Sequence, residues 1–182
     1  MIDGAGAARP PPLAITGMSK VPVLVTGGAG YIGSHAVLAL RDAGWSVAVI
    51  DDLSTGSRYL LPEDVPFYEG NVADRALVER IFAEQGIGAI MHFAGSIVVP
   101  ESVEEPLDYY RNNTVASHSL ISTAVDAGIR HFVFSSTAAV YGEPERVPVD
   151  EAVAKLPINP YGASKLMTER MLEDAAAAYP LN

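Results

Sequence analysis

The fold is decided by one stretch of sequence, VLVTGGAGYIGS at residues 23–34. It begins as a short apolar run, and it leads into a segment with helical periodicity from Ser34 to Ala43. Glycines recur at every third position between the two. We expect Gly27 to permit a tight turn, Gly30 to let a bound group approach the backbone, and Gly33 to let the helix pack against its strand.

Short apolar runs alternate with helical patterns along the rest of the sequence. This alternation predicts an α/β fold with a doubly wound parallel sheet, buried between helices on both faces. Gly44 and Gly128 stand where two helices should end, and Asp74 stands where one should begin. The further strands are expected at 47–50, 66–68, 89–93 and 131–134, and the further helices at 74–85, 106–127 and 163–178.

An acidic residue follows the second predicted strand. Asp51 lies 18 residues beyond Gly33, where a carboxylate can accept hydrogen bonds from both hydroxyls of an adenosine ribose. Together with the glycines, it indicates a dinucleotide site that favours NAD over NADP, because a carboxylate repels a 2′-phosphate. The nearest cation, Arg58, comes seven residues later. The alternative is that Asp51 only caps a turn.

Tyr161 and Lys165 form a Tyr-x-x-x-Lys pair, whose members share one face of a helix. A nearby ammonium stabilises a phenolate, so this phenol can take a proton from an alcohol as hydride leaves the carbon. Upstream, Ser135-Ser136-Thr137 ends the fifth predicted strand at the same sheet edge as the glycine turn. Between them, the four prolines of residues 142–160 predict an irregular loop over that edge. The combination is a strong indication of hydride-transfer chemistry.

The composition excludes several other classes of function. With a formal net charge of −10 and scattered Lys and Arg residues, the surface disfavours nucleic acid and anionic membranes. No apolar run approaches the roughly 18 residues that cross a bilayer. The absence of cysteine excludes disulfides, thiolate catalysis and Cys-based zinc sites. The four histidines lack metal-ligand spacing, and we expect each to be a strand-end or helix-surface residue.

The first 20 residues differ from the rest in composition. They are rich in Ala, Gly and Pro, which predicts a disordered extension before a single domain at 21–182. Asp3 and Pro10-Pro11-Pro12 stand where a signal peptide needs basic and apolar residues, so we expect a cytoplasmic location. Met18 is a second candidate for the true start of the chain.

Several longer motifs resemble those of the UDP-glucose 4-epimerases, in the extended short-chain dehydrogenase/reductase family. The resemblance covers about residues 21–180, nearly the whole predicted domain. The segments that carry it are VTGGAGYIGSH at 25–35, HFAG at 92–95, ESV at 101–103, YYRNN at 109–113, SSTAAVYG at 135–142 and NPYGASK at 159–165.

The resemblance implies a Rossmann-type fold that keeps NAD as a tightly held prosthetic group and acts on a UDP-hexose. Tyr161 would be base and acid at the sugar 4-hydroxyl, Lys165 would contact the nicotinamide ribose and tune Tyr161, and Thr137 would relay the proton. Hydride would pass from sugar C4 to NAD and return to the opposite face of a 4-keto sugar, which interconverts UDP-glucose and UDP-galactose in galactose metabolism. The residues implied to bind NAD are Gly27, Gly30, Tyr31, Ile32, Gly33, Asp51, Asp52, Asn71, Val72, Phe93, Ala94, Gly95, Asn113, Ser135, Tyr161 and Lys165.

The sequence departs from the family pattern in three places. Asn71 stands where the family usually has an Asp that contacts the adenine amino group, and residues 96–99 lack a Lys that some relatives place near the pyrophosphate. Members of the family continue into a second lobe that grips the UDP-sugar, whereas this sequence stops at Asn182. We therefore expect a fragment or one half of a split enzyme, inactive alone, with an exposed apolar sheet edge. The resemblance also makes a homodimer an expectation, through the helices at 106–127 and around Tyr161.

Two rival functions stay open. One is another sugar-nucleotide enzyme on the same scaffold, such as a decarboxylase or an epimerase for a different UDP-sugar; a dehydratase is disfavoured because Ala138-Ala139 replace its Asp-Glu. The other is a non-catalytic NAD-binding protein, against which the intact Thr137, Tyr161 and Lys165 argue.

Overall fold

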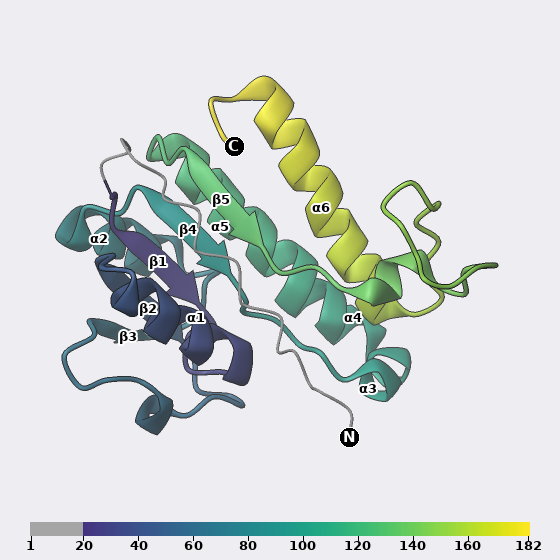
Figure 1. Cartoon of the computed structure of the whole chain (residues 1–182), viewed down its shortest axis with the longest axis horizontal. Helices are drawn as coiled ribbons and strands as arrows, with labels where there is room; N and C mark the ends of the chain where they lie inside the picture. Colours follow the sequence, from purple (N-terminus) through teal and green to yellow (C-terminus); the bar gives the residue numbers. More distant parts are fainter. Residues whose placement is uncertain (1–19) are drawn as a thin grey trace, which may run out of the picture.

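The computed structural model describes residues 20–182, so the expectations for residues 1–19, Met18 included, lie outside it. Five parallel strands form one sheet in the order β3-β2-β1-β4-β5, which confirms the predicted doubly wound α/β fold (Figure 1). Each strand overlaps an expected one. The strands are β1 Val23–Thr26, β2 Val47–Asp51, β3 Phe67–Glu69, β4 Ala89–His92 and β5 His131–Phe134.

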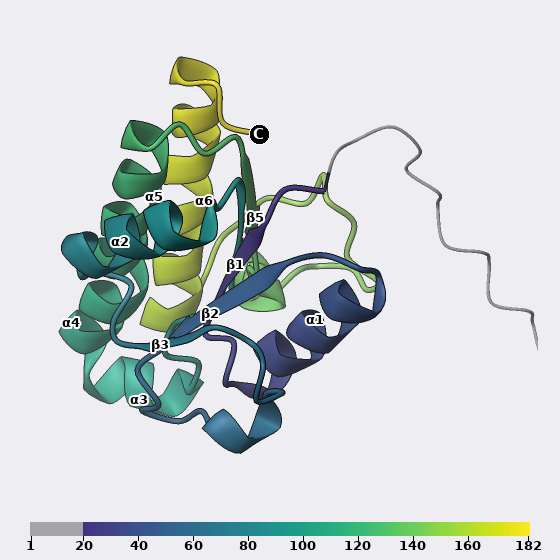
Figure 2. The same ribbon diagram turned by 90° about the vertical axis from the view of Figure 1, so that its left-hand side faces the viewer.

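Helices lie on both faces of the sheet. The long ones are α1 Tyr31–Asp42, α2 Arg75–Gln85, α5 Ala116–Asp126 and α6 Pro160–Ala178. Figure 2 shows α1 on one face and the other three on the opposite face. Alternate strand residues enter two cores, because successive side chains of a strand point to opposite faces: Leu24 and Ile90 pack with α2 and α5, and Val25 and Val49 pack with α1.

The β5 edge is more open than the rest of the sheet. Val133 shares a face with Val25 and is 54 % exposed, since no helix among residues 20–182 covers that face over β5. The outer edge of β5 is partly paired: Asn182 donates to the Arg130 carbonyl at 2.7 Å, and Phe132 donates to the Asn182 carbonyl at 2.8 Å. We expected an exposed apolar sheet edge. The exposed apolar side chain, Val133, lies instead on the face of β5.

The expected single helix at 106–127 is wrong, because the segment is interrupted. It consists of α4 (Pro106–Tyr109), a π-helical turn labelled η2 (Tyr110–Val115), and α5. A further short helix, α3 (Val99–Glu104), precedes it and was not expected. A π turn holds one extra residue in the helix and re-aims its side chains, and such turns are frequent at functional sites.

The ends of the helices follow local sequence signals. The Asp74 side chain accepts from Leu77 N at 3.1 Å, and Gly44 and Gly128 adopt positive φ values of 76° and 72°, as expected. Helix α6 begins three residues earlier than predicted, because Asn159 caps it by accepting from Gly162 N at 2.8 Å. Proline at the first helical position supports the same start.

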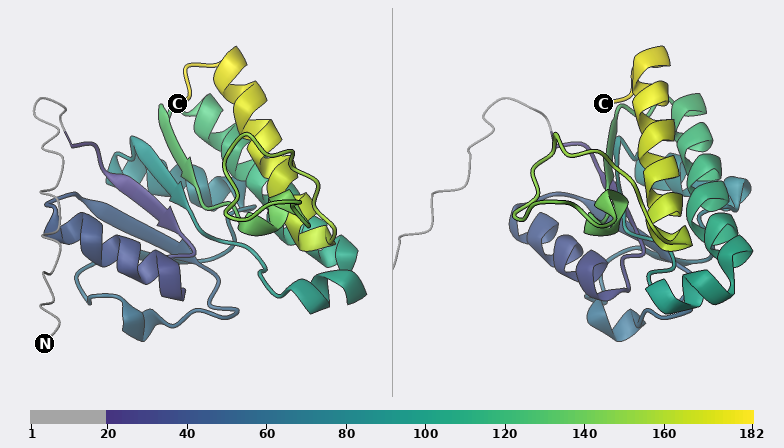
Figure 3. Two further views of the ribbon diagram at one scale, coloured as in Figure 1. Left: turned by 45° about the vertical axis from the view of Figure 1, so that its right-hand side comes forward. Right: turned by 90° about the vertical axis from the view of Figure 1, so that its right-hand side faces the viewer.

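The remaining elements are short. They are the 3₁₀ turns η1 (Arg58–Leu60) and η3 (Ala138–Tyr141). Between η3 and α6, residues 142–159 contain neither helix nor strand, as their prolines predict. In both views of Figure 3 this loop leaves η3 and returns to the first turn of α6 without entering the sheet.

Candidate functional site

Three glycines of the turn after β1 lack room for a side chain, and a Cβ on Gly28 would lie 2.6 Å from Val49 Cγ1. Gly27 has φ +65°, and a Cβ there would lie 2.6 Å from Ala94 N; a Cβ on Gly33 would lie 2.2 Å from the Gly27 carbonyl oxygen. Gly30 differs, because its Cβ would meet only that carbonyl, at 3.2 Å. The fold itself therefore leaves room at Gly30, as expected of a backbone that a ligand approaches.

The amino end of α1 offers unpaired backbone donors. The first intrahelical bond runs from Ser34 N to the Gly30 carbonyl at 2.9 Å, and no side chain of residues 20–182 caps the helix. The amides of Tyr31, Ile32 and Gly33 precede that bond, and no acidic residue stands in the first turn. A helix start of this kind suits a phosphate, because free N–H groups and the positive end of the helix dipole point at it.

Asp51 lies at the carboxyl end of β2 beside this turn. It is only 8 % exposed, and its two carboxylate oxygens accept from Ala29 N and Leu53 N, each at 2.9 Å. The turn-capping role is therefore present. It does not exclude ribose binding, since each carboxylate oxygen has a second lone pair. The bond to Ala29 N also fixes the carboxylate relative to the glycine turn.

The next carboxylate, Asp52, is joined to Asn71 across the ends of β2 and β3. Asn71 Nδ2 donates to Asp52 Oδ2 at 3.2 Å, while its Oδ1 accepts from Ala73 N at 2.9 Å. Partial burial raises the pKa of Asp52, but hydrogen bonds from Ser54 and Asn71 outweigh it and leave the pKa below its ordinary value. Val72, the following residue, is buried in the core.

The turn after β4 meets the π turn at one amide side chain. Gly95 has φ +150°, and a Cβ there would lie 2.8 Å from Asn113 Oδ1. That oxygen accepts from Ser96 N at 2.7 Å, and Asn113 Nδ2 donates to Ser96 O and to Ser164 Oγ, both at 3.0 Å. Asn113 therefore joins Ser96, at the end of the turn after β4, to helix α6. Phe93 and Ala94 lie in the same turn, directly after β4.

Tyr161 lies in the first turn of α6, one turn before Lys165. Its ring makes an edge-to-face contact with buried Tyr109, with centroids 6.5 Å apart. The Tyr109 hydroxyl contacts Glu101 Oε2 at 2.7 Å, and burial, followed by this hydrogen bond, raises the pKa of Tyr109 to about 12. The pair Glu101–Tyr109 was not recognised in the sequence as support for Tyr161; only their place in the family motifs drew attention to them.

Thr137 is brought to the start of α6 by η3. Its hydroxyl accepts from Ala139 N at 3.2 Å, and a Cβ on the next α6 residue, Gly162, would lie 2.6 Å from the Ala139 carbonyl oxygen. The turn after Thr137 thus packs directly on the helix that carries Tyr161. Ser135 lies just before, with its amide donating to the His92 carbonyl at 3.1 Å.

A second contact holds the same strand end, and the sequence reading missed it. Glu169 bonds to Ser136 Oγ and, through its other oxygen, to Lys155 Nζ at 2.5 Å. The carboxylate therefore ties the end of β5 and the loop 142–159 to α6. The signal was available: Glu169 comes four residues after Lys165, on the same helix face.

Lys165 is buried without a counter-charge. It is 4 % exposed, its Nζ lies 4.6 Å from the centre of the Phe134 ring, and it forms no ion pair within residues 20–182. Burial lowers the pKa of Lys165 from 10.5 to about 8. A cation held at this cost to folding is typical of a functional site.

Lys165→Met is expected to stabilise the protein. Below pH 8 the ammonium is charged in both states and opposes folding; as pH rises from about 8 to 10.5, the folded state loses the proton first, so wild-type stability rises. At pH 7 the variant should therefore be more stable by on the order of 1–3 kcal/mol. Denaturant unfolding at pH 7 and pH 10.5 measures this. A less stable variant at pH 7, or a difference that does not shrink with pH, would contradict it.

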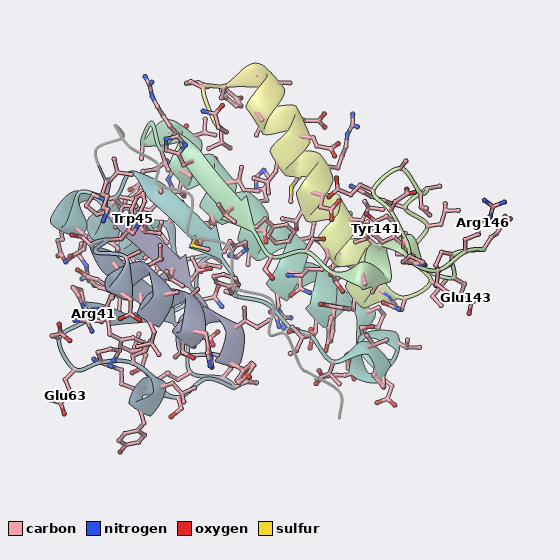
Figure 4. The ribbon with its side chains drawn as sticks, viewed as in Figure 1. Arg41, Trp45, Glu63, Tyr141, Glu143 and Arg146 are labelled. Atoms are coloured by element: carbon pink, nitrogen blue, oxygen red, sulfur yellow. The ribbon has the colours of Figure 1, made fainter. Side chains whose placement is uncertain are left out.

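A hollow lined by Arg41, Trp45 and Asp64 lies at the amino ends of β1 and β2, and Figure 4 shows Arg41 and Trp45 far from Tyr141 at the opposite end. Among residues 20–182 no three His, Asp or Glu side chains gather as metal ligands. None of the helices there is long and apolar enough to cross a membrane.

Known proteins resemble this chain in sequence and in structure. The profile of the NAD dependent epimerase/dehydratase family matches residues 23–182. A UDP-glucose 4-epimerase of Azospirillum brasilense is 60 % identical over 159 residues, which are 87 % of this chain and 46 % of that protein. The chain thus spans about half the length of the curated relatives it matches.

Solved structures agree with the sequence match. UDP-glucose 4-epimerase from Brucella ovis in complex with NAD superposes with a TM-score of 0.86 at 42 % identity, over 89 % of this chain and 50 % of that one. The UDP-Glc/GlcNAc 4-epimerase of Campylobacter jejuni gives a TM-score of 0.84 at 44 % identity, over 88 % and 50 %.

Proposed function

The chain belongs to the NAD dependent epimerase/dehydratase family, and from that membership we propose that residues 21–182 are the NAD-binding and catalytic part of a UDP-hexose 4-epimerase. The observation that carries the proposal is one arrangement. Tyr161 and Lys165 lie on α6, and Asn113 joins that helix to the turn at 93–96, beside the glycine turn. UDP-glucose/UDP-galactose interconversion, and with it galactose metabolism and a cytoplasmic location, are parts of this proposal.

The residues present fit a bound NAD. The amides of Tyr31, Ile32 and Gly33 would hold the pyrophosphate, Asp51 the adenosine ribose, and Asp52, Asn71 and Val72 the adenine end. Phe93, Ala94, Gly95, Asn113 and Ser135 would line the nicotinamide half. Gly30 supports this reading, because the described fold leaves room there for a ligand to approach the backbone. When bound, NAD supplies the carrier that accepts a hydride and returns it.

Tyr161 is the group that moves the proton. Its phenolate would take the proton of the sugar 4-hydroxyl as hydride leaves C4, and return it when hydride re-enters from the other face. Thr137, placed by η3 against the start of α6, would hydrogen-bond the same sugar oxygen. Lys165, one helical turn after Tyr161, would contact the nicotinamide ribose with its ammonium. Tyr109 and Glu169 hold the elements that carry these groups.

NAD is expected to bind at least about 100-fold more tightly than NADP, because placing a 2′-phosphate against Asp51 costs several kcal/mol. Arg58 does not offset this, since its guanidinium donates to the carbonyls of Leu61 and Pro62, at 3.1 and 3.2 Å, and lies over the Phe67 ring. Titration calorimetry with both cofactors measures the ratio. Arg58→Ala is the matched control and should leave it unchanged; a ratio near one in either protein would contradict the assignment.

The function is tested by epimerisation of UDP-galactose. We expect activity from a protein that joins residues 21–182 to a UDP-sugar lobe such as the second half of the A. brasilense relative. We expect residues 1–182 alone to bind NAD and turn over no UDP-hexose. Turnover by the 182-residue chain would overturn the second expectation, and an inactive but folded, NAD-loaded joined protein would overturn the proposed reaction.

The alternatives differ in what they need from this chain. An N-acetylated UDP-hexose would use the same Tyr161 and Lys165, and the C. jejuni neighbour is described as a UDP-Glc/GlcNAc 4-epimerase. A non-catalytic NAD-binding protein would bind NAD without needing Tyr161. A homodimer is also proposed: Leu107, Val115 and Met167 are exposed apolar side chains on the helices that the family resemblance places at the interface.

A further inference from the structure

His92 ends β4 as a fully enclosed side chain. It is 1 % exposed, and both its ring nitrogens face hydroxyls: Nδ1 lies 2.6 Å from Thr26 Oγ1, and Nε2 lies 2.9 Å from Ser117 Oγ. Thr26 and Ser117 are equally buried. A strand-end position was expected for this histidine, but nothing in the sequence indicated that it connects β1, β4 and α5.

The partners of the two hydroxyls fix the direction of every hydrogen bond. Ser117 Oγ–H donates to the Asn113 carbonyl, so its oxygen accepts from His92 Nε2–H. Nδ1 is then the acceptor for Thr26 Oγ1–H, and Thr26 Oγ1 accepts from Ala94 N at 3.4 Å. These hydrogen bonds therefore all donate in the same direction, from the turn after β4 through a neutral imidazole to the π turn.

The far end of this chain lies at the catalytic helix. The backbone carbonyl of Asn113 accepts the hydrogen bond from Ser117. The side-chain amide of Asn113 donates to Ser96 O and to Ser164 Oγ. Ser164 in turn donates to the Tyr161 carbonyl at 2.7 Å. Every member of this network is buried or half-buried, and within residues 20–182 no buried side-chain donor or acceptor lacks a partner. A network that is fully satisfied holds its members in one arrangement.

A charged imidazole does not fit this site. His92 stacks on the Phe134 ring with centroids 5.6 Å apart, and the Lys165 ammonium lies over the same ring. Burial, and then the charge of Lys165, lower the pKa of His92 to about 3. An imidazolium would also donate at both nitrogens, which leaves the Thr26 hydroxyl without its acceptor.

We propose that His92 is a positioning residue for the Tyr161 site: as the neutral Nε2–H tautomer it locks the π turn so that Asn113 spans the gap between Ser96 and α6. The inference rests on the proposed function, because the gap it sets is the one in which the nicotinamide and Tyr161 would meet. Its own evidence is the one-way chain of hydrogen bonds, which needs no cofactor.

The tautomer is tested first, by ¹⁵N–¹H correlation of the histidine rings in the 182-residue chain without cofactor. We expect a protonated Nε2 and an unprotonated Nδ1 for His92. A protonated Nδ1, or an imidazolium at neutral pH, would overturn the proposal whatever the protein catalyses.

Positioning is tested with two hydroxyl deletions on the same helix. Ser117→Ala interrupts the series of hydrogen bonds between His92 and Asn113. Thr123→Val is its control, because the Thr123 hydroxyl is also buried and also donates to a carbonyl four residues back, that of Ser119, at 2.8 Å. We expect Ser117→Ala to shift the Asn113 side-chain amide and Tyr161 ring signals and to weaken NAD binding about tenfold, and Thr123→Val to do neither. Equal effects on these signals would overturn the proposal. Shifted signals without any NAD binding, wild type included, would instead contradict only the proposed function.

Discussion

Tyr161→Phe is expected to lower kcat for UDP-hexose epimerisation by about 10²–10⁴-fold, the usual contribution of a general acid–base group. The measurement requires a protein that carries the UDP-sugar lobe together with residues 21–182. NAD affinity should change by less than about threefold, because the phenyl ring and its edge-to-face contact with Tyr109 remain. The loss should therefore appear in kcat and in kcat/KM alike.

The control for this variant is another tyrosine hydroxyl. Tyr68→Phe removes an OH that bonds to Glu84 at 2.7 Å and Gln85 at 2.8 Å, on β3 and away from α6. It should leave kcat within about twofold, since nothing near Tyr161 changes. Comparable losses in both variants, or a Tyr161→Phe enzyme that still epimerises at the wild-type rate, would remove Tyr161 from the mechanism.

Gly33→Ala is expected to lower the free energy of unfolding by about 3 kcal/mol, and to abolish NAD binding. Its new methyl would lie 2.2 Å from the Gly27 carbonyl oxygen and 2.8 Å from Gly28 Cα. Both contacts are to backbone, which can yield only by moving α1 away from β1. That movement would also displace the amides of Tyr31 and Ile32. Denaturant unfolding and NAD titration measure the two effects.

Gly30→Ala separates cofactor binding from folding. Its methyl would meet only the Gly27 carbonyl oxygen, at 3.2 Å, and Gly30 has an ordinary φ of −78°. We expect a loss of stability below about 1 kcal/mol, but NAD affinity weakened at least tenfold, since the methyl occupies the approach to the backbone. A stable, NAD-binding Gly33→Ala, or a Gly30→Ala that binds NAD normally, would contradict the assigned roles.

The sheet could be predicted from sequence because its signals are local. Buried parallel strands are short apolar runs, and Gly44, Asp74 and Gly128 mark helix ends through backbone conformations and caps that a single residue supplies. The late prediction for the start of α6 was avoidable, since Asn159 followed by Pro160 is a capping signal.

The π turn could not be predicted in this way. The sequence from Pro106 to Gly128 has helical periodicity throughout, and the extra residue at Tyr110–Val115 is favoured by partners far along the chain. Those partners are His92, which bonds to Ser117, and Ser164, which bonds to Asn113. The uncovered face of β5 is likewise a property of which elements pack there, which residue periodicity does not contain.

In the candidate site, too, residues with a local sequence signal could be assigned, and those that meet only in the fold could not. The glycine turn and Asp51 could be assigned from spacing, and Tyr161 with Lys165 from helical geometry. Thr137 was indicated as part of a strand-end run of hydroxyls, and the resemblance gave it a role. The contribution of Asn113 came only through the family resemblance, because its element meets α6 in space and not in sequence. Glu169 and Tyr109 were missed, although each touches a group that was named.

In the proposed reaction, hydride leaves C4 of a UDP-hexose and returns to the same carbon, with Tyr161 carrying the proton. We would test this with UDP-galactose that carries deuterium at C4, epimerised by the protein that joins residues 21–182 to a UDP-sugar lobe. We expect deuterium at C4 of the UDP-glucose formed, because the hydride never exchanges with water. Replacement of the deuterium by solvent hydrogen would contradict it.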